Sequence, residues 1–160
     1  TGYDVYWSYC NGKNNFNKLA NVPKSQKYAD KNLNNKKEYK YFTVAYKMSG
    51  GKKVYLGRTN TVHVAMPYAA KTNVLKVTVN KTKVNLAKGK TFKITKKVKL
   101  ENSKKKALNH LTKKERFITS NAKVATVSSA GVIKAVRKGT CTIYVMSENG
   151  VCAKIKVTVK

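Results

Sequence analysis

The sequence contains very few acidic residues. Asp and Glu together number 6 among 160 residues, against 35 Lys and Arg, so the formal net charge is +29. Hydrolysis by paired carboxylates requires two acids at a fixed separation over a cleft, whereas these six are scattered through expected turns and strand ends. The sequence also lacks a Gly-rich phosphate loop, a serine elbow and a Glu-x-x-His pattern. We therefore expect that these residues form no enzyme.

Arginine is scarce as well, since the only arginines are Arg58, Arg116 and Arg137. Arginine is the usual residue for bidentate recognition of phosphates and base edges, whereas lysine is a compact, hydrated point charge. The composition therefore indicates diffuse attraction to polyanions and disfavours specific reading of nucleic acid. Because so basic a protein would collect nucleic acid inside a cell, we expect an extracellular location, with anionic cell-wall or host polysaccharides as partners.

Long apolar runs are absent too. No run reaches the 18 residues of a membrane-spanning helix, so we expect no membrane insertion. The three cysteines and two histidines lack the spacing of a metal site, so no metal or other cofactor is expected. No secretory leader is recognisable, and Thr1-Gly2-Tyr3 already leads into a strand, so we expect the chain to be part of a longer protein.

The clearest pattern that is present is alternation near the C-terminus. On the expected last strand, residues 153–159, Ile155 and Val157 fall on one face and Lys154 and Lys156 on the other. This strand has a core side and a wet, cationic side. The hydrophobic content of 41% supports a buried core despite the charge.

Asn149-Gly150 precedes this strand and is a strong signal for a two-residue type I′ hairpin turn. Such a turn places Cys152 opposite Ser147, and Cys141 opposite about Thr158. Cys141 then faces the core, and the two sulfur atoms lie far apart on different faces. We therefore expect no disulfide between them.

Several short motifs occur in order in the second half of the chain. They are Lys83 to Phe92, Ser120 to Val127, Gly131 to Ala135, Lys138 to Thr140 and Lys156 to Val159. Together they resemble the bacterial immunoglobulin-like group 2 domain over roughly residues 74–160. The resemblance implies a small β-sandwich that serves as a spacer or adhesive unit in secreted and surface-anchored proteins.

The first half of the chain also alternates. Its expected strands are residues 3–9, 16–22, 39–48, 53–56 and 61–64, the last two forming one return strand interrupted near Gly57.

This half resembles a fibronectin type III module. The residues that carry the resemblance are Gly2 to Tyr6, Leu33 with Tyr39 six residues later, Tyr41, Ala45, Tyr46 and Asn60 to Val62. It implies a tyrosine corner, in which the buried Tyr39 hydroxyl bonds to nearby backbone. The family has two strands before the Gly-Tyr lead-in, and nothing here supplies them. The face with Tyr3, Val5 and Trp7 would then be uncovered and would invite dimerisation or strand swapping.

We therefore predict an all-β protein of two small immunoglobulin-like β-sandwich modules in tandem, the first lacking its initial strands. The first module covers residues 1–67, a linker residues 68–73, and the second module residues 74–160. Within the second module, residues 91–100 are expected to form one strand with a bulge near Lys96-Lys97. Residues 101–115 are expected to form a long surface loop.

Basic residues gather around this loop and the strand before it. The candidate polyanion contacts are Lys96, Lys97, Lys99, Lys104, Lys105, Lys106, Lys113, Lys114 and Arg116. An equally good interpretation is a solvated, self-repelling surface. The hypothesis that follows is a non-catalytic spacer or adhesion module of a bacterial surface or secreted protein. The alternatives are accessory modules of a larger secreted enzyme and a nucleic-acid-binding protein, the latter supported by charge alone.

Overall fold

The computed structural model describes residues 1–10, 13–23, 27–108 and 116–160, and every regular element in these ranges is a strand. The all-β expectation is therefore confirmed. Contacts within the chain divide it into two compact units, Thr1–Thr72 and Asn73–Lys160, called unit 1 and unit 2 below.

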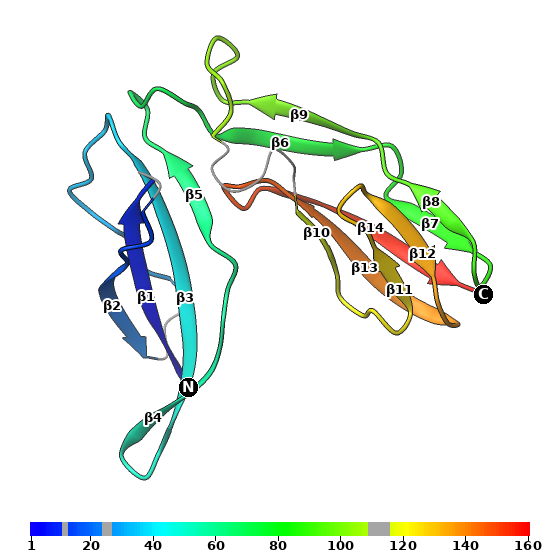
Figure 1. Cartoon of the computed structure of the whole chain (residues 1–160), viewed down its shortest axis with the longest axis horizontal. Coiled ribbons are helices and arrows are strands. Elements are labelled where there is room, and N and C mark those ends of the chain that lie inside the picture. Colours follow the sequence, from blue (N-terminus) through cyan, green and yellow to red (C-terminus); the bar gives the residue numbers. More distant parts are fainter. Residues whose placement is uncertain (11–12, 24–26, 109–115) are drawn as a thin grey trace. The chain divides into compact units, whose positions relative to one another are not determined.

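Unit 1 is built on one antiparallel sheet with the strand order β2-β1-β3-β4, in which β5 also pairs with β3 (Figure 1). The long strand β3 is central because β1 pairs with it from Tyr39 to Tyr46 on one side, and β4 and β5 pair with it on the other. The interruption of the return strand near Gly57 is thus confirmed. The bounds are β1 Gly2–Tyr9, β2 Asn17–Pro23, β3 Glu38–Ser49, β4 Lys52–Arg58 and β5 Val62–Ala65.

The register assigns the side chains of unit 1 to two faces. Tyr3 lies opposite Ala45, and Val5 lies opposite Thr43, so these four residues share one face, which we call the apolar face. Asp4 and its neighbours on alternate positions lie on the opposite face. There Tyr46 packs directly over Gly2, where an added Cβ would lie 2.4 Å from the tyrosine hydroxyl oxygen. Only glycine leaves room for this contact.

Unit 2 has two layers, as expected for an immunoglobulin-like sandwich. One layer is the sheet β10-β13-β14-β7, in which β14 and β7 are parallel, and the other consists of the sheet β11-β12-β8 and the two-stranded ribbon β6-β9. The bounds are β6 Val74–Val79, β7 Lys83–Leu86, β8 Thr91–Lys93, β9 Lys96–Leu100, β10 Arg116–Thr119, β11 Ala125–Val127, β12 Val132–Ala135, β13 Gly139–Met146 and β14 Cys152–Val159.

The core of unit 2 lies between these layers, and strands from all three sheets contribute to it. Ile143 on β13 and Ile155 and Val157 on β14 are 0% exposed, whereas Lys154 and Lys156 between them reach solvent. Burying one such side chain stabilises the fold by about 1.5–3 kcal/mol. The alternation predicted for the last strand is confirmed, and β-branched residues dominate this core.

The expected single strand over residues 91–100 is wrong. The chain leaves the sheet β11-β12-β8 after Lys93 and enters the ribbon β6-β9 at Lys96. Ile94 is buried at the crossing, and its N–H donates to the Gly131 carbonyl at 2.9 Å. The irregular alternation that suggested a bulge is therefore a change of sheet.

The predicted type I′ turn is also wrong. Ser147 N–H donates to the Val151 carbonyl, so the loop has three residues, and only Gly150 has positive φ (85°). This matches a type I turn followed by a left-handed residue. The longer loop lets the Asn149 side chain bond both backbone groups of Val74, at 3.3 Å to the N–H and 2.9 Å to the carbonyl.

The longer loop shifts the register of the hairpin by one residue. Cys152 pairs with Met146, and Cys141 pairs with Val157. Cys141 faces the core as predicted, and within the described residues Cys141 and Cys152 are both free thiols.

Candidate functional site

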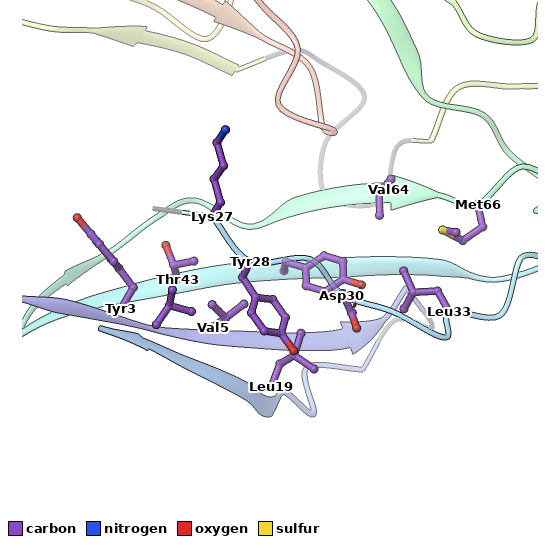
Figure 2. Close-up of a pocket in the computed structure, with 12 residues that line it drawn as sticks. Tyr3, Val5, Leu19, Lys27, Tyr28, Asp30, Leu33, Thr43, Val64 and Met66 are labelled. Carbon is purple, nitrogen blue, oxygen red and sulfur yellow. Dashed lines mark hydrogen bonds between the residues drawn. The ribbon is translucent and has the colours of Figure 1, made fainter. Parts of the chain in front are cut away.

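A trough of about 770 Å³ lies on the apolar face of unit 1 (Figure 2). Its floor comes from four strands, because β1, β2, β3 and β5 each turn side chains to this face. One wall comes from the segment between β2 and β3, of which Tyr28, Asp30 and Leu33 lie over the face, while Lys27 extends away from it. The floor residues are Tyr3, Val5, Leu19, Val22, Tyr41, Thr43 and Val64, with Met66 following β5.

Two tyrosines of β3 fix the wall segment in place. The Tyr41 hydroxyl donates to the Asp30 carboxylate at 2.8 Å, and the Asn34 N–H donates to the hydroxyl oxygen of Tyr39 at 2.8 Å. Burial raises the pKa of Tyr39 above its ordinary value, and burial together with the Asp30 hydrogen bond does the same for Tyr41. Both phenols therefore remain neutral.

The Tyr39 bond is the one expected for a tyrosine corner. Tyr39 is buried and its hydroxyl is tied to backbone five residues earlier. The bond is a local contact, however, and does not by itself identify the family of unit 1. The described strands of unit 1 form a single sheet, so the uncovered face predicted from Tyr3 and Val5 corresponds to the trough.

The opposite face of unit 1 carries a buried carboxylate. Asp4 is 0% exposed and accepts from Lys53 Nζ at 2.8 Å, Asn21 Nδ2 at 2.9 Å and the Tyr55 hydroxyl at 3.2 Å, with Lys18 Nζ at 3.1 Å. Burial raises the pKa of Asp4, but the hydrogen bonds from Lys53, Lys18 and Asn21 outweigh burial, so the pKa lies below its ordinary value. This cluster holds β1, β2 and β4 together.

Cys10 and His63 form a contact that sequence spacing did not reveal. Cys10 Sγ lies 3.2 Å from His63 Nδ1, across 53 positions of sequence, and His63 is 1% exposed. The two side chains are within hydrogen-bonding distance, and the tautomer of the imidazole decides which of them donates. Neither residue lines the trough.

The predicted polyanion contacts fall into three groups. Lys97 and Lys99 are exposed on the outer face of the ribbon β6-β9, and Lys104 and Lys106 are exposed in the turn that follows it. Lys96 instead turns toward the Phe117 ring, 5.5 Å from its centroid, and Lys105 is half-buried. Lys113 and Lys114 lie outside the described residues.

Arg116, the remaining predicted contact, is paired within unit 2. Its guanidinium lies 3.3 Å from the Glu148 carboxylate, and the two side chains are 19% and 7% exposed. This pair was not predictable from sequence, because Glu148 is 32 positions away from Arg116. The strand register adds Lys76 to the candidate polyanion contacts, because Lys76 lies directly opposite Lys99 on the same face of the ribbon.

The described residues show neither a metal site nor a membrane-spanning helix. No three His, Cys, Asp or Glu side chains in these ranges come together in a way that could hold a metal ion. Likewise, no helix in the described part of the chain is long and apolar enough to cross a membrane.

Solved structures of the S-layer protein SbsC are similar to this chain. Domains 4 and 5 of the S-layer protein SbsC match with a TM-score of 0.45 and 19% identity over 75% of this chain and 64% of that one. Two longer structures, rSbsC(31-844) and SbsC domains 1-6, match with a TM-score of 0.45 and 20% identity over 77% and 76% of this chain, and 16% of each of theirs. A likeness at this level carries no argument about function, and this chain spans less than two thirds of each of those proteins.

The sequence comparison is more specific. No curated protein matches the chain significantly. Residues 73–159, which coincide with unit 2, match the family described as Bacterial Ig-like domain (group 2). Unit 2 has the two layers and the shared core that an immunoglobulin-like sandwich requires. The chain therefore belongs to the family of bacterial Ig-like domains (group 2).

Proposed function

We propose that this chain is a non-catalytic, extracellular module of a bacterial surface protein, which acts as a spacer and contacts anionic polymers through the ribbon of unit 2. The observation that carries the proposal is the lysine-lined outer face of β6-β9 on a bacterial Ig-like domain. The contact surface, called the lysine track below, is Lys76, Lys97, Lys99, Lys104 and Lys106.

The register places like charges opposite each other on the lysine track. Lys76 and Lys99 are cross-strand partners, and Lys97 lies two residues from Lys99 on the same face. Like charges directly opposite each other on a sheet are destabilising. An anion bound between these ammonium groups relieves their repulsion. Because the free protein already carries this unfavourable repulsion, its relief adds to the free energy of binding.

The carboxylates of unit 2 that lie within the described residues bond to groups outside the lysine track. Glu148 pairs with Arg116, and Glu101 accepts from Asn73 Nδ2 at 3.0 Å. By sequence, unit 2 carries 22 basic and 3 acidic residues, a net charge of +19. A linear polyanion neutralises this excess and releases its own counterions, which is the driving force for lysine-mediated binding.

The first experiment is a titration with two polyanions, poly(glycerol phosphate) and dextran sulfate, at low and high salt, with neutral dextran as the control. We expect binding of both polyanions at low salt, no binding of dextran, and a loss of affinity of about tenfold or more between 50 and 200 mM salt. An affinity that does not change with salt would contradict the electrostatic mechanism.

The second experiment locates the surface with two double charge reversals. Lys97→Glu/Lys99→Glu changes the lysine track, and Lys154→Glu/Lys156→Glu changes β14, where the pair has the same i, i+2 spacing. Both variants change the net charge by the same amount. We expect the first to weaken polymer binding at least fivefold more than the second. Equal losses of affinity in the two variants would show that the polymer binds over the whole basic surface and not at the lysine track.

A further inference from the structure

The contact between Cys10 and His63 brings together residues from the two strands that flank β3. Cys10 directly follows β1, where its N–H donates to the Glu38 carbonyl at 2.9 Å, and His63 lies on β5. The Cys10 Sγ is 3.2 Å from His63 Nδ1. The imidazole is 1% exposed, whereas the cysteine is half-buried. A small molecule can therefore reach the sulfur, while solvent hardly reaches the imidazole.

A buried ammonium lies next to this pair. Lys40 of β3 is the cross-strand partner of both Ser8 and His63, so its side chain shares one face of the sheet with the imidazole. Lys40 is 5% exposed, and its Nζ donates to the Lys13 carbonyl and, at 3.1 Å, to Asn14 Oδ1. A fixed positive charge in this position favours a thiolate over a thiol and a neutral imidazole over an imidazolium.

The other titratable groups around the pair change this balance little. Glu38 lies two residues before Lys40 on the same face and opposes a thiolate, but it is only half-buried, so solvent screens its charge more than that of Lys40. Lys13 is exposed. Burial and the Asp30 carboxylate raise the pKa of Tyr41, so its phenol is neutral.

We propose that Cys10 is a site of covalent modification, at which the thiol exchanges with a low-molecular-weight disulfide and His63 acts as the base. His63 with its proton on Nε2 accepts the S–H proton at Nδ1. The thiolate then attacks one sulfur of the disulfide, and a new sulfur–sulfur bond forms as the old one breaks.

The exchange is balanced without a further reactant. The leaving thiolate takes the proton from the His63 imidazolium and departs as a thiol, so the imidazole returns to its starting state. The Cys10 sulfur is oxidised and the leaving sulfur is reduced. The product is a mixed disulfide on Cys10. The proposal is independent of the lysine track, which lies on unit 2.

The other two cysteines are internal controls. Cys141 is 4% exposed in the core of unit 2, and Cys152 on β14 is half-buried like Cys10. In the part of the chain that the structure describes, no histidine bonds to either of these sulfur atoms. Cys152 therefore reports the reactivity of a partly accessible thiol without an imidazole.

The first test treats the full chain with bis(2-hydroxyethyl) disulfide, which is small and uncharged, so the basic surface does not attract it. Peptide mapping by mass spectrometry gives the rate at each cysteine. At pH 7 we expect Cys10 to react at least about tenfold faster than Cys152, and Cys141 to react most slowly. Equal rates at Cys10 and Cys152 would overturn the proposal.

The second test measures the same rates between about pH 6 and 9.5. At high pH a thiol ionises without a base, so the advantage of Cys10 over Cys152 should shrink as the pH rises. A ratio that stays constant with pH would assign the faster reaction to exposure alone. This measurement uses the unaltered chain and does not depend on the folding of a variant.

The third test removes the base. In His63→Gln we expect the Cys10 rate to fall at least about tenfold at pH 7 and to approach that of the unaltered chain at high pH, with the Cys152 rate unchanged. A loss by the same factor at every pH would mean that His63 only positions Cys10, and would contradict its role as the base.

Discussion

Unit 1 and unit 2 use the same alternation of apolar and polar residues, but only unit 2 encloses its apolar residues between two layers. Ile143, Ile155 and Val157 are fully buried there. In unit 1, Val5 and Val22 remain 9% exposed at the floor of an open trough. The difference indicates that complete enclosure of a strand's apolar residues requires a second layer. It also predicts that the same substitution has different consequences in the two units.

The largest difference is expected from valine-to-alanine substitutions. Val157→Ala opens a cavity in an enclosed core and should cost unit 2 about 2–3 kcal/mol of unfolding free energy. Val5→Ala removes two methyl groups from a side chain that is 9% exposed at the floor of the trough, and should cost unit 1 about 1.5 kcal/mol, because water can fill the space and no cavity cost is added. Urea unfolding followed by amide signals of each unit measures both values. Equal losses would mean that the trough is closed in solution.

The next largest effect concerns Asp4, which links β1, β2 and β4 of unit 1 by polar contacts. Asp4→Asn removes the charge that Lys53 and Lys18 bond, and should cost about 1–2 kcal/mol at neutral pH. The folded pKa of Asp4 lies below its ordinary value, so its contribution is fully present above about pH 4 and is lost as the pH falls through the folded pKa.

Stability of unit 1 should therefore decline on acidification in the unaltered chain. In Asp4→Asn the part of this decline that Asp4 causes should be absent. Thermal unfolding between pH 2 and 7 provides the comparison, and unit 2 serves as the internal control. A decline of the same size in the variant would assign the pH dependence to other carboxylates.

The smallest effect concerns the Tyr39 hydroxyl. Tyr39→Phe removes the bond from the Asn34 N–H and should destabilise unit 1 by about 1 kcal/mol. Tyr144→Phe on the outer face of β13 is the matched control, with an expected change below about 0.5 kcal/mol. The amide signals of residues 27–36 should also shift in Tyr39→Phe alone, because this bond helps to hold the segment over the trough.

Much of the fold could be predicted because alternation is a local signal. The faces of β14, the inward position of Cys141 and the interrupted return strand of unit 1 all follow from neighbouring residues. The family of unit 2 follows from ordered motifs. The Tyr39 bond to Asn34 was predictable because both residues lie within one short segment.

The errors arose where distant residues decide the local structure. Asn149-Gly150 did not form a tight turn, because Asn149 bonds the backbone of Val74, 75 positions earlier. The chain changes sheets after Lys93 because different strands pair with its two parts. β8 pairs with β12, and β9 pairs with β6. Arg116 was counted as a polymer contact because its partner Glu148 could not be seen in the sequence. Lys76 was missed because only the register places it beside Lys99.

The central claim is that unit 2 is a two-layered sandwich, whereas the described strands of unit 1 form a single sheet. Residue-resolved amide hydrogen exchange on the full chain tests it most directly. We predict that the slowest amides lie in β13 and β14, and that those of β1 and β3 exchange with an opening free energy at least about 2 kcal/mol lower. Equal protection of β1 and β14 would contradict the account.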